Sequence, residues 1–472
     1  MVAFGLFDDW HPQPGRLTTW TASPRSRAQM LEAPRHEIGP SYQQEAYLRA
    51  AHRNTGAALR VSRLCMISFD IPGVPDQRAM TAAVNEFLRR HDTFSSWFER
   101  DSGDRVIRHV ADPAAIEFIP EDLGEFSDIA ALRERVQAVT PGPFEWDCFS
   151  FGVIERPDSF TVYAAVDHLH TDGVAQALSC VDLLWLYGNE MAGTVTALPR
   201  VDGHLAYCAR ERRLNERLTL ESHAVRRWVE VLRDNDGDVP SFPLDLGEAA
   251  GYRPGAQATT TLLTEPEMLR FEEACQARGG RVVGGWFTAL ALTEYELSGR
   301  TNYFGLAPAN TRFLPGEEAS VGWYTNLIPV VVPVDSGSTF AGLVAVAQES
   351  AECAKDLTDV SLHRVLELIT PDLGIRTRPG FAAPMLSYVD VRKFPGAQLF
   401  DRIKGGLYAT PASSGEVYVW INRLPEETTL SVLFPDTPQA HESVRKYIGA
   451  FTGVINAVVS DGDYAVRVPA LS

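Results

Sequence analysis

The residues best suited to chemistry lie in one short stretch of the sequence, Asp167-His168-Leu169-His170-Thr171-Asp172-Gly173. It directly follows residues 159–166, a run of β-branched and aromatic side chains that predicts a buried strand. A strand that ends in His-x-x-x-Asp-Gly carries an imidazole to the rim of a sheet. A neutral imidazole there can remove a proton from a bound hydroxyl or amine. The pattern therefore makes His168 a candidate general base.

The other polar residues of this stretch have competing interpretations. Asp172 could orient the imidazole, but a turn at the strand end points it away from His168 and favours a structural anchor that pairs with an arginine. Gly173 permits the sharp turn into the next helix. His170 could form a metal pair with His168. Because no further ligand with suitable spacing is nearby, packing in the loop is favoured for His170.

The remaining sequence predicts alternating strands and helices, which is typical of an α/β protein. Strands are predicted at 59–70, 106–110, 116–119, 146–155, 160–166, 260–263, 303–306, 327–332, 385–389, 418–422 and 430–434. Helices are predicted at 42–52, 77–92, 128–139, 174–187, 207–218, 225–232, 265–277, 283–297, 340–357, 362–368 and 441–458. Ser41 and Asp76 are the predicted N-caps of the first two helices. Residues 11–40 predict an extended arm, because they are rich in Pro, Ser, Thr and Arg.

Composition limits the classes of function. The 472 residues carry a formal net charge of -18, which disfavours nucleic acid and anionic membranes as partners. The six cysteines form no C-x-x-C pair and predict free, mostly buried thiols. We expect no transmembrane segment, since no run approaches the ~20 apolar residues of a membrane helix. The N-terminus lacks the basic region of a signal peptide, so we expect a soluble, cytoplasmic protein.

Several nucleotide and hydrolase motifs are absent from the sequence. It contains no Gly-x-Ser-x-Gly, no Walker A motif and no Gly-x-Gly-x-x-Gly, which argues against serine hydrolases, P-loop enzymes and Rossmann dehydrogenases. The pair Gly322-Trp323 lies in a loop before a predicted strand and, on its own, indicates a core anchor. Arg89, Arg90 and His91 end a predicted helix, where positive charge complements the helix dipole.

Four stretches together resemble the condensation-domain superfamily, which includes chloramphenicol acetyltransferase-like and BAHD acyltransferases and nonribosomal peptide condensation domains. They are Ser41-Tyr42-Gln43, Arg90-His91-Asp92-Thr93-Phe94, the His168–Gly173 motif and Gly322-Trp323. The chain further resembles the mycobacterial polyketide-associated (Pap-type) acyltransferases that acylate trehalose. That resemblance rests on Asp8-Asp9-Trp10 with Pro12 and Pro14, on 88–93, on Trp146-Asp147-Cys148-Phe149-Ser150-Phe151-Gly152-Val153-Ile154, and on 167–170.

The resemblance implies a fold of two chloramphenicol-acetyltransferase-like α/β lobes in a V, a pseudo-dimer with a central tunnel. Residues 1–200 would form the first lobe, 201–258 linker helices, and 259–472 the second lobe. His168 would lie in the tunnel, and Gly322, Trp323 and Tyr324 would belong to a bridging loop. Asp167, Thr325 and Asn326 are further tunnel candidates. Asp172 would pair with Arg312 or Arg90, between which the sequence does not decide.

The chain departs from the pattern of condensation domains at Asp167, at Ser95, where the family often has arginine, and at Ser320-Val321. Those domains usually carry a second histidine where this chain has Asp167. The trehalose-acylating subgroup shares the aspartate, which argues for ester rather than amide formation. The usual Asp-Phe before Gly-Trp is Ser320-Val321 here, so we expect the bridging loop to be held differently.

The predicted function is transfer of an acyl group from acyl-CoA or an acyl carrier protein of a polyketide synthase to a hydroxyl of a sugar such as trehalose. His168 would act as the base, and acyl-CoA or acyl-phosphopantetheine would be a co-substrate. We expect no permanently bound cofactor and no metal. We expect the protein to be a monomer. The backbone N–H of Gly173 and the side chains of 323–326 are candidate oxyanion donors. The alternatives are an amide-forming condensation enzyme and a catalytically silent carrier-protein-binding scaffold, against which the intact His168 and Asp172 argue.

Overall fold

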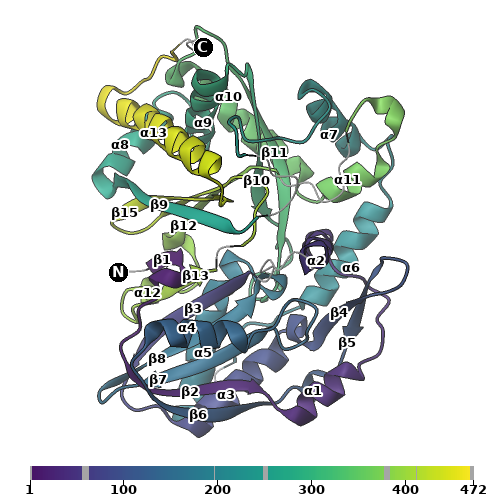
Figure 1. Cartoon of the computed structure of the whole chain (residues 1–472), viewed down its shortest axis with the longest axis vertical. Helices are drawn as coiled ribbons and strands as arrows, with labels where there is room; N and C mark the ends of the chain where they lie inside the picture. Colours follow the sequence, from purple (N-terminus) through teal and green to yellow (C-terminus); the bar gives the residue numbers. More distant parts are fainter. Residues whose placement is uncertain are drawn as a thin grey trace. The chain divides into compact units, whose positions relative to one another are not determined.

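The computed structural model describes residues 3–55, 63–195, 197–247, 253–376, 383–410 and 412–467. The chain divides into two compact units (Figure 1). The first unit comprises residues 1–213, 312–324 and 392–412, and the second comprises 214–311, 325–391 and 413–472. Each unit is a β-sheet with helices packed on it, which confirms the predicted α/β class.

The first unit contains the candidate motif. Its strands are β1 (Ala3–Leu6), β2 (Gly15–Ala22), β3 (Leu64–Pro72), β4 (Ser96–Arg100), β5 (Val106–Val110), β6 (Phe118–Phe126), β7 (Phe149–Glu155), β8 (Ser159–Asp167) and β13 (Gly406–Ala409). Its helices are α1 (Pro24–Leu31), α2 (Tyr42–Thr55), α3 (Gln77–Arg90), α4 (Ile129–Ala138), α5 (Gly173–Ala192), α12 (Ala397–Phe400) and most of α6 (His204–Glu216). Among the described residues, seven strands form one sheet in the order β1-β13-β3-β8-β7-β2-β6, and β4 and β5 form a separate hairpin.

Strand β8 lies in the middle of this sheet, antiparallel to β3 on one side and β7 on the other. Residues 160–167 are all buried, which explains why the sequence of this strand is an almost continuous apolar run rather than an alternating one. Strands β7 and β8 form an antiparallel hairpin, with Phe149 opposite Val166. The central position of β8 fixes its C-terminal end, and thereby the start of the motif.

The second unit has its own sheet, in the order β11-β10-β12-β14-β15-β9 among the described residues. Its strands are β9 (Gly255–Thr264), β10 (Asn302–Asn310), β11 (Thr325–Pro333), β12 (Met385–Asp390), β14 (Tyr418–Arg423) and β15 (Glu427–Pro435). Its helices are α7 (His223–Asp234), α8 (Glu265–Gln276), α9 (Val282–Ser298), α10 (Phe340–Ala354), α11 (Leu362–Leu368) and α13 (Pro438–Asp461).

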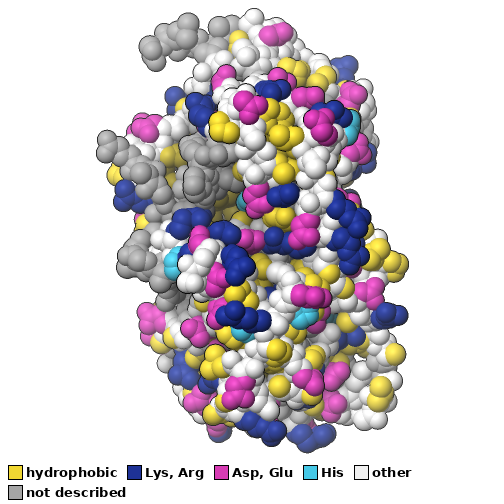
Figure 2. All heavy atoms as spheres, turned by 90° about the vertical axis from the view of Figure 1, so that its right-hand side faces the viewer, with side chains coloured by type: hydrophobic (Ala, Val, Ile, Leu, Met, Phe, Trp, Pro, Cys, Tyr) yellow, Lys and Arg dark blue, Asp and Glu magenta, His cyan; other side chains and the backbone are white. Residues whose placement is uncertain are grey.

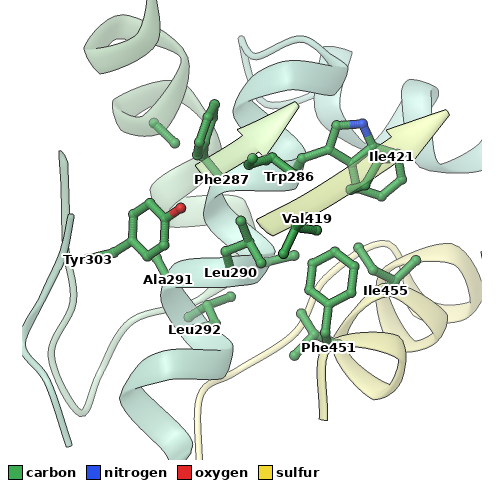
Figure 3. Close-up of a cluster of buried hydrophobic side chains, with 14 of the residues drawn as sticks. Trp286, Phe287, Leu290, Ala291, Leu292, Tyr303, Val419, Ile421, Phe451 and Ile455 are labelled. Carbon is green, nitrogen blue, oxygen red and sulfur yellow. The ribbon is translucent and has the colours of Figure 1, made fainter. Parts of the chain in front are cut away.

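The core of the second unit is built around α9, which is apolar on nearly all sides because it is buried between other elements. Figure 3 shows Trp286 and Leu290 of α9 beside Val419 of β14 and Phe451 of α13. The Trp286 and Phe451 rings lie 6.4 Å apart. This core accounts for the long apolar run that predicted a helix at 283–297.

The expectation of an extended arm at 11–40 is wrong. Residues 15–22 form β2, which pairs with both β6 and β7 inside the sheet. Trp20 of β2 is buried with an exposed fraction of 1%. The Ser23 hydroxyl accepts a hydrogen bond from the Ser26 N–H and caps α1, and Pro24 occupies the first helical turn. The prolines and serines of this region therefore mark a helix start rather than an irregular arm.

The observed units differ from the contiguous lobes predicted at 1–200 and 259–472. Strand β13, from residues 406–409, pairs with β1 and β3 in the sheet of the first unit. The region 201–258 is not a separate linker, because α6 lies mostly in the first unit and α7 packs its buried Val225 and Trp228 into the second. Contacts between segments far apart in sequence decide the division, and these are invisible in local composition.

The described residues also bear on the surface and on membrane association. No helix within them is both long and apolar enough to cross a bilayer. On the face that Figure 2 presents, acidic and basic side chains are interspersed. All six cysteines are free thiols, and five of them are buried, as predicted; Cys353 is exposed.

Candidate active site

The turn that carries His168 is fixed by hydrogen bonds to its backbone. Strand β8 ends at Asp167, and residues 168–170 form a single 3-10 turn before α5 begins. The Asp167 carboxylate accepts from the Leu169 N–H at 2.9 Å and caps this turn. The His168 N–H donates to the Arg63 carbonyl at 2.8 Å, and Gln44 Nε2 donates to the Leu169 carbonyl at 2.8 Å. The backbone of the turn is thus held by neighbours on both sides.

His168 is a half-buried residue, and its imidazole packs against an indole. Its ring centroid lies 4.3 Å from that of Trp323. Nδ1 is buried and has no hydrogen-bond partner among the residues that the structure describes. Burial, followed by the positive charge of Arg63, lowers the pKa of His168 to about 4. The ring is therefore neutral at physiological pH, which is the state that a general base requires.

The Asp172 carboxylate is held by two backbone N–H groups and by an arginine, as expected of a structural anchor. Asp172 is the N-cap of α5, where its carboxylate accepts from the Ala175 N–H at 2.8 Å. The same carboxylate forms a two-pronged ion pair with the Arg312 guanidinium, at 2.9 and 3.2 Å, and accepts from the Tyr324 N–H at 2.8 Å. The structure thereby separates the two candidate arginines. Arg90 pairs instead with Asp182, at 2.9 Å.

The segment 312–324 is held to the rest of the first unit at several points. Besides pairing with Asp172, the Arg312 guanidinium donates to the carbonyls of Ser320 and Gly322. The Val321 N–H donates to His91 Nδ1 at 3.3 Å. A side chain at Gly322 could not be accommodated, since a Cβ there would lie 2.5 Å from Cδ2 of His204. These contacts explain why a glycine must precede Trp323.

The Ser320-Val321 departure gives this loop its own contacts. Ser320 Oγ accepts from the Tyr324 hydroxyl at 2.9 Å, and both residues are buried. Val321 is also buried, with its N–H on the His91 imidazole. Burial lowers the pKa of His91, whose other ring nitrogen lies 2.9 Å from Asp182. A neutral His91 that donates to Asp182 and accepts from Val321 satisfies both contacts.

Of the predicted tunnel residues, Trp323 contacts the His168 ring. Trp323 also packs edge-on against Tyr47, with centroids 5.6 Å apart. Asp167 is fully buried and accepts from the Tyr47 hydroxyl at 3.2 Å as well as from Leu169, so it braces the turn. The Tyr324 side chain is buried against the Arg312 guanidinium, 4.3 Å from it.

Thr325 and Asn326 belong to the start of β11 in the second unit. Asn326 is buried, and its Nδ2 donates to the carbonyls of Thr358 and Val360 at 2.8 and 2.9 Å. The side chains of Tyr324 and Asn326 are thus both committed to internal partners, which weakens their assignment as oxyanion donors. Gly173 is the first residue of α5.

His170 packs in the loop, as the favoured interpretation held. It is buried between Phe94 and Phe149, and Nδ1 lies 2.9 Å from the Thr93 hydroxyl. Burial, followed by the positive charges of His204 and Arg108, lowers the pKa of His170 to about 3. A neutral, internally bonded imidazole at this position stiffens the turn next to His168.

Four residues near the turn were missed by sequence reasoning: Gln44, Tyr47, Arg63 and His204. Ser41 was predicted as the N-cap of this helix, and the structure shows reciprocal hydrogen bonds between Ser41 and Gln44. Local patterning could not reveal that Gln44 also reaches the Leu169 carbonyl, 125 residues away. His204 Nε2 lies 3.1 Å from the Trp323 carbonyl, across 119 residues of sequence.

The protein has the condensation-domain fold, with two α/β units of chloramphenicol-acetyltransferase type. The first unit carries His-x-x-x-Asp-Gly at the end of a central strand. Solved structures agree. The chain matches the PapA2 acyl transferase with a TM-score of 0.89 at 38% identity, covering 97% of this chain and 100% of that one. The first condensation domain of the calcium-dependent antibiotic synthetase matches with a TM-score of 0.68 at 16% identity, over 93% of this chain and 100% of that one, which bears on fold alone.

Sequence comparison gives the same family. The condensation-domain family matches residues 65–372. Trehalose-2-sulfate acyltransferase PapA2 of Mycobacterium tuberculosis is 38% identical over 99% of this chain and 100% of its own length. The 2'-acyl-2-O-sulfo-trehalose (hydroxy)phthioceranyltransferase PapA1 of Mycobacterium bovis is 38% identical over 98% of this chain and 89% of its own length. The chain belongs to the condensation-domain family, and it is an acyltransferase of that family.

Proposed function

We propose that the protein transfers an acyl group from a thioester, either acyl-CoA or an acyl carrier protein, to a hydroxyl of trehalose or a trehalose derivative. The observation that carries the proposal is the neutral imidazole of His168, held at the end of β8 and packed on Trp323. The names of the relatives, which specify trehalose-2-sulfate and 2'-acyl-2-O-sulfo-trehalose, support the sugar acceptor.

The proposed base is Nε2 of His168. Nδ1 is buried, so the accessible edge of the ring is the one opposite to it. Nε2 takes the proton of the sugar hydroxyl as the oxygen attacks the thioester carbonyl. A C–O bond forms, and the tetrahedral intermediate collapses with cleavage of the C–S bond. The departing thiolate takes the proton from the imidazolium, which leaves an ester, a free thiol and neutral His168. No covalent acyl-enzyme is required.

Asp167 does not select the acceptor by direct contact in this proposal. Its carboxylate is buried and committed to Leu169 and Tyr47. Where condensation domains usually carry a second histidine, this chain therefore has a residue that braces the turn. The consequence is that one imidazole, that of His168, serves the acceptor hydroxyl.

The test is incubation of the protein with acyl-CoA and a panel of trehalose, trehalose-2-sulfate and amine acceptors, with product mass as the readout. We expect an ester of a trehalose. His168→Ala should lower turnover by about 10²–10⁴-fold, which is the usual contribution of a general base. His441→Ala is the matched control, because His441 lies on α13 in the second unit and its side chain is exposed.

Three outcomes would contradict the proposal. Turnover near the wild-type value in His168→Ala would exclude it as the base. An amide product would assign the chain to amide-forming condensation. Binding of acyl carrier protein, without product from any acceptor or donor, would indicate a silent scaffold.

A further inference from the structure

A buried guanidinium lies beneath the His168 turn. Arg108 of β5 has an exposed fraction of 1%, and its guanidinium packs over the Phe98 ring. Its Nη1 donates to Ser96 Oγ at 3.1 Å, and its Nη2 donates to the Gly39 carbonyl at 3.2 Å. Within the part of the chain that the structure describes, no carboxylate lies within ion-pair distance of Arg108. A buried charge without a counter-ion is strongly destabilising, and Arg cannot lose its proton in compensation.

The acidic group nearest to this cation is a thiol. Cys208 of α6 is fully buried, and its Sγ lies 3.1 Å from Arg108 Nη2. On its other side, Sγ lies 3.6 Å from Nδ1 of His204, one helical turn earlier. A thiol in this position is therefore flanked by a permanent cation, by an imidazole that can accept its proton, and by Gln44 Oε1 at 3.7 Å.

The same cluster contacts both groups that define the candidate active site. Gln44 Oε1 accepts from Arg108 Nη2 at 3.3 Å, while its Nε2 holds the Leu169 carbonyl in the His168 turn. His204 Nε2 lies 3.1 Å from the Trp323 carbonyl, where a protonated imidazole would donate. Trp323 in turn packs on the His168 ring. Two short chains of contacts thus connect Cys208 to the backbone of the His168 turn and to Trp323, which packs on the His168 ring.

We propose that Cys208 is a buried thiolate, the counter-ion of Arg108 and of a protonated His204, and that this cluster is a positioning device for the His168 turn and Trp323. In this arrangement the thiol proton resides on His204 Nδ1. Nε2–H of the same ring then donates to the Trp323 carbonyl. The cluster carries one negative and two positive charges, and the carbonyls of Gly39 and Trp323 and the Gln44 oxygen solvate the excess positive charge.

The electrostatics of the five buried cysteines agree with this assignment. Burial raises the pKa of the thiols of Cys65, Cys148, Cys180 and Cys275. Burial also acts to raise the pKa of Cys208, but His204 and Arg108 together outweigh it, so that its pKa is lowered. The pKa of His204 is raised, because the interaction with Cys208 outweighs the effect of burial.

Other titratable groups face the cluster from each packed element. Glu211 of α6 accepts from the Tyr42 N–H and the Tyr207 hydroxyl, and burial raises the pKa of its carboxyl. His170 of the turn is held neutral by burial. Burial raises the pKa of Tyr324, so its phenol remains protonated. None of these groups competes with Cys208 for the charge of Arg108.

The first test measures the thiolate itself and needs no substrate, so its result is independent of the proposed function. The ultraviolet thiolate absorption is recorded at pH 7 for wild type, Cys208→Ser and Cys180→Ser. We expect a thiolate band that is lost in Cys208→Ser and retained in Cys180→Ser. The band should also disappear when the wild-type protein is unfolded at the same pH, because an ordinary thiol has a pKa near ~8.5. Absence of the band from the folded wild type would overturn the proposal, even if no variant folds.

The second test addresses positioning, and this half rests on the proposed function. Cys208→Ser keeps a small polar side chain but not the charge, whereas Cys208→Asp restores an anion. We expect kcat to fall roughly tenfold in Cys208→Ser with KM little changed, which is less than the ~10²-fold that a 1 Å misplacement can cost. Cys208→Asp should recover most of the loss. Equal losses of kcat in the two variants, or a change confined to KM, would overturn the positioning role. The ionisation state of Cys208 would then be judged from the ultraviolet absorption alone.

Discussion

Replacing Asp172 should destabilise the protein far more than replacing an ordinary helix N-cap residue does. Its carboxylate makes four hydrogen bonds, to the Ala175 N–H, to two nitrogens of Arg312 and to the Tyr324 N–H. The side chains of Asp172 and Arg312 have exposed fractions of 8% and 3%, so Asp172→Ala leaves a guanidinium buried without its partner. Breaking a buried pair in this way costs about 3–5 kcal/mol, and loss of the cap adds about 1 kcal/mol.

Asp76 offers a matched control. It caps α3 as Asp172 caps α5, since its carboxylate accepts from the Ala79 N–H at 2.8 Å, but no cation lies within ion-pair distance of it among the described residues. Asp76→Ala should therefore cost only about 1 kcal/mol. The difference between the two variants, about 3–5 kcal/mol, isolates the pair with Arg312. At about 2–4 °C per kcal/mol, the extra loss in Tm for Asp172→Ala should be roughly 10 °C.

The assay is thermal and urea unfolding of wild type, Asp172→Ala, Asp76→Ala and the double variant Asp172→Ala/Arg312→Met. Removal of the stranded cation should make the double variant at least as stable as Asp172→Ala alone. Turnover is measured on the same samples below their unfolding transitions. The reasoning would be refuted by an Asp172→Ala protein that unfolds like Asp76→Ala. A fully stable but inactive Asp172→Ala would instead indicate a direct catalytic role.

Three further predictions follow from individual sites. The pKa of His168 is lowered to about 4, so the acid limb of the pH profile of kcat/KM should lie near pH 4 to 5. An inflection in the usual histidine range, near ~6.5, would contradict the neutral state proposed for the base. Trp323→Ala should lower kcat roughly tenfold, because the ring packed on His168 is lost, and Trp323→Phe should lose less; steady-state kinetics of both variants tests this. Burial raises the pKa of Glu294 in the second unit to about 8, so the protein should lose stability as pH rises from about 4.5 to 8, where the unfolded chain is ionised and the folded one is not. Glu294→Gln should accordingly raise the Tm relative to wild type at pH 8 and not at pH 4, and equal differences at both values would rule out this titration.

Much of the fold could be predicted because its signals are local. The continuous apolar run of β8, the capping residues Ser41 and Asp76 and the all-round apolar α9 each indicate their element without knowledge of the partner. Strand β13 was missed because its four residues carry too short a pattern, and its place between β1 and β3 comes from pairing with segments that are more than 300 residues away.

The candidate site divides in the same way. The sequence predicted the strand-end position of His168 and a structural Asp172 bound to an arginine. It could not choose between Arg90 and Arg312 as the partner of Asp172, because both arginines lie in or near stretches that match the family. The choice depends on which position along α5 each guanidinium reaches in the folded protein. Arg90 meets Asp182 two turns or more along that helix, whereas Arg312 meets Asp172 at its start.

By itself, the sequence determined the α/β class, the position of the motif at a strand end and the resemblance to an acyltransferase family, since all three reside in short-range patterns of side chains. The tertiary structure decided which groups surround His168. Trp323, 155 residues later in the sequence, covers the His168 ring. Burial at this position lowers the pKa of His168, so the imidazole is neutral. The tertiary structure also brought Arg108 to Cys208 across 100 residues of sequence. Burial and long-range pairing set the charge of these groups, and neither property is contained in any local stretch of the chain.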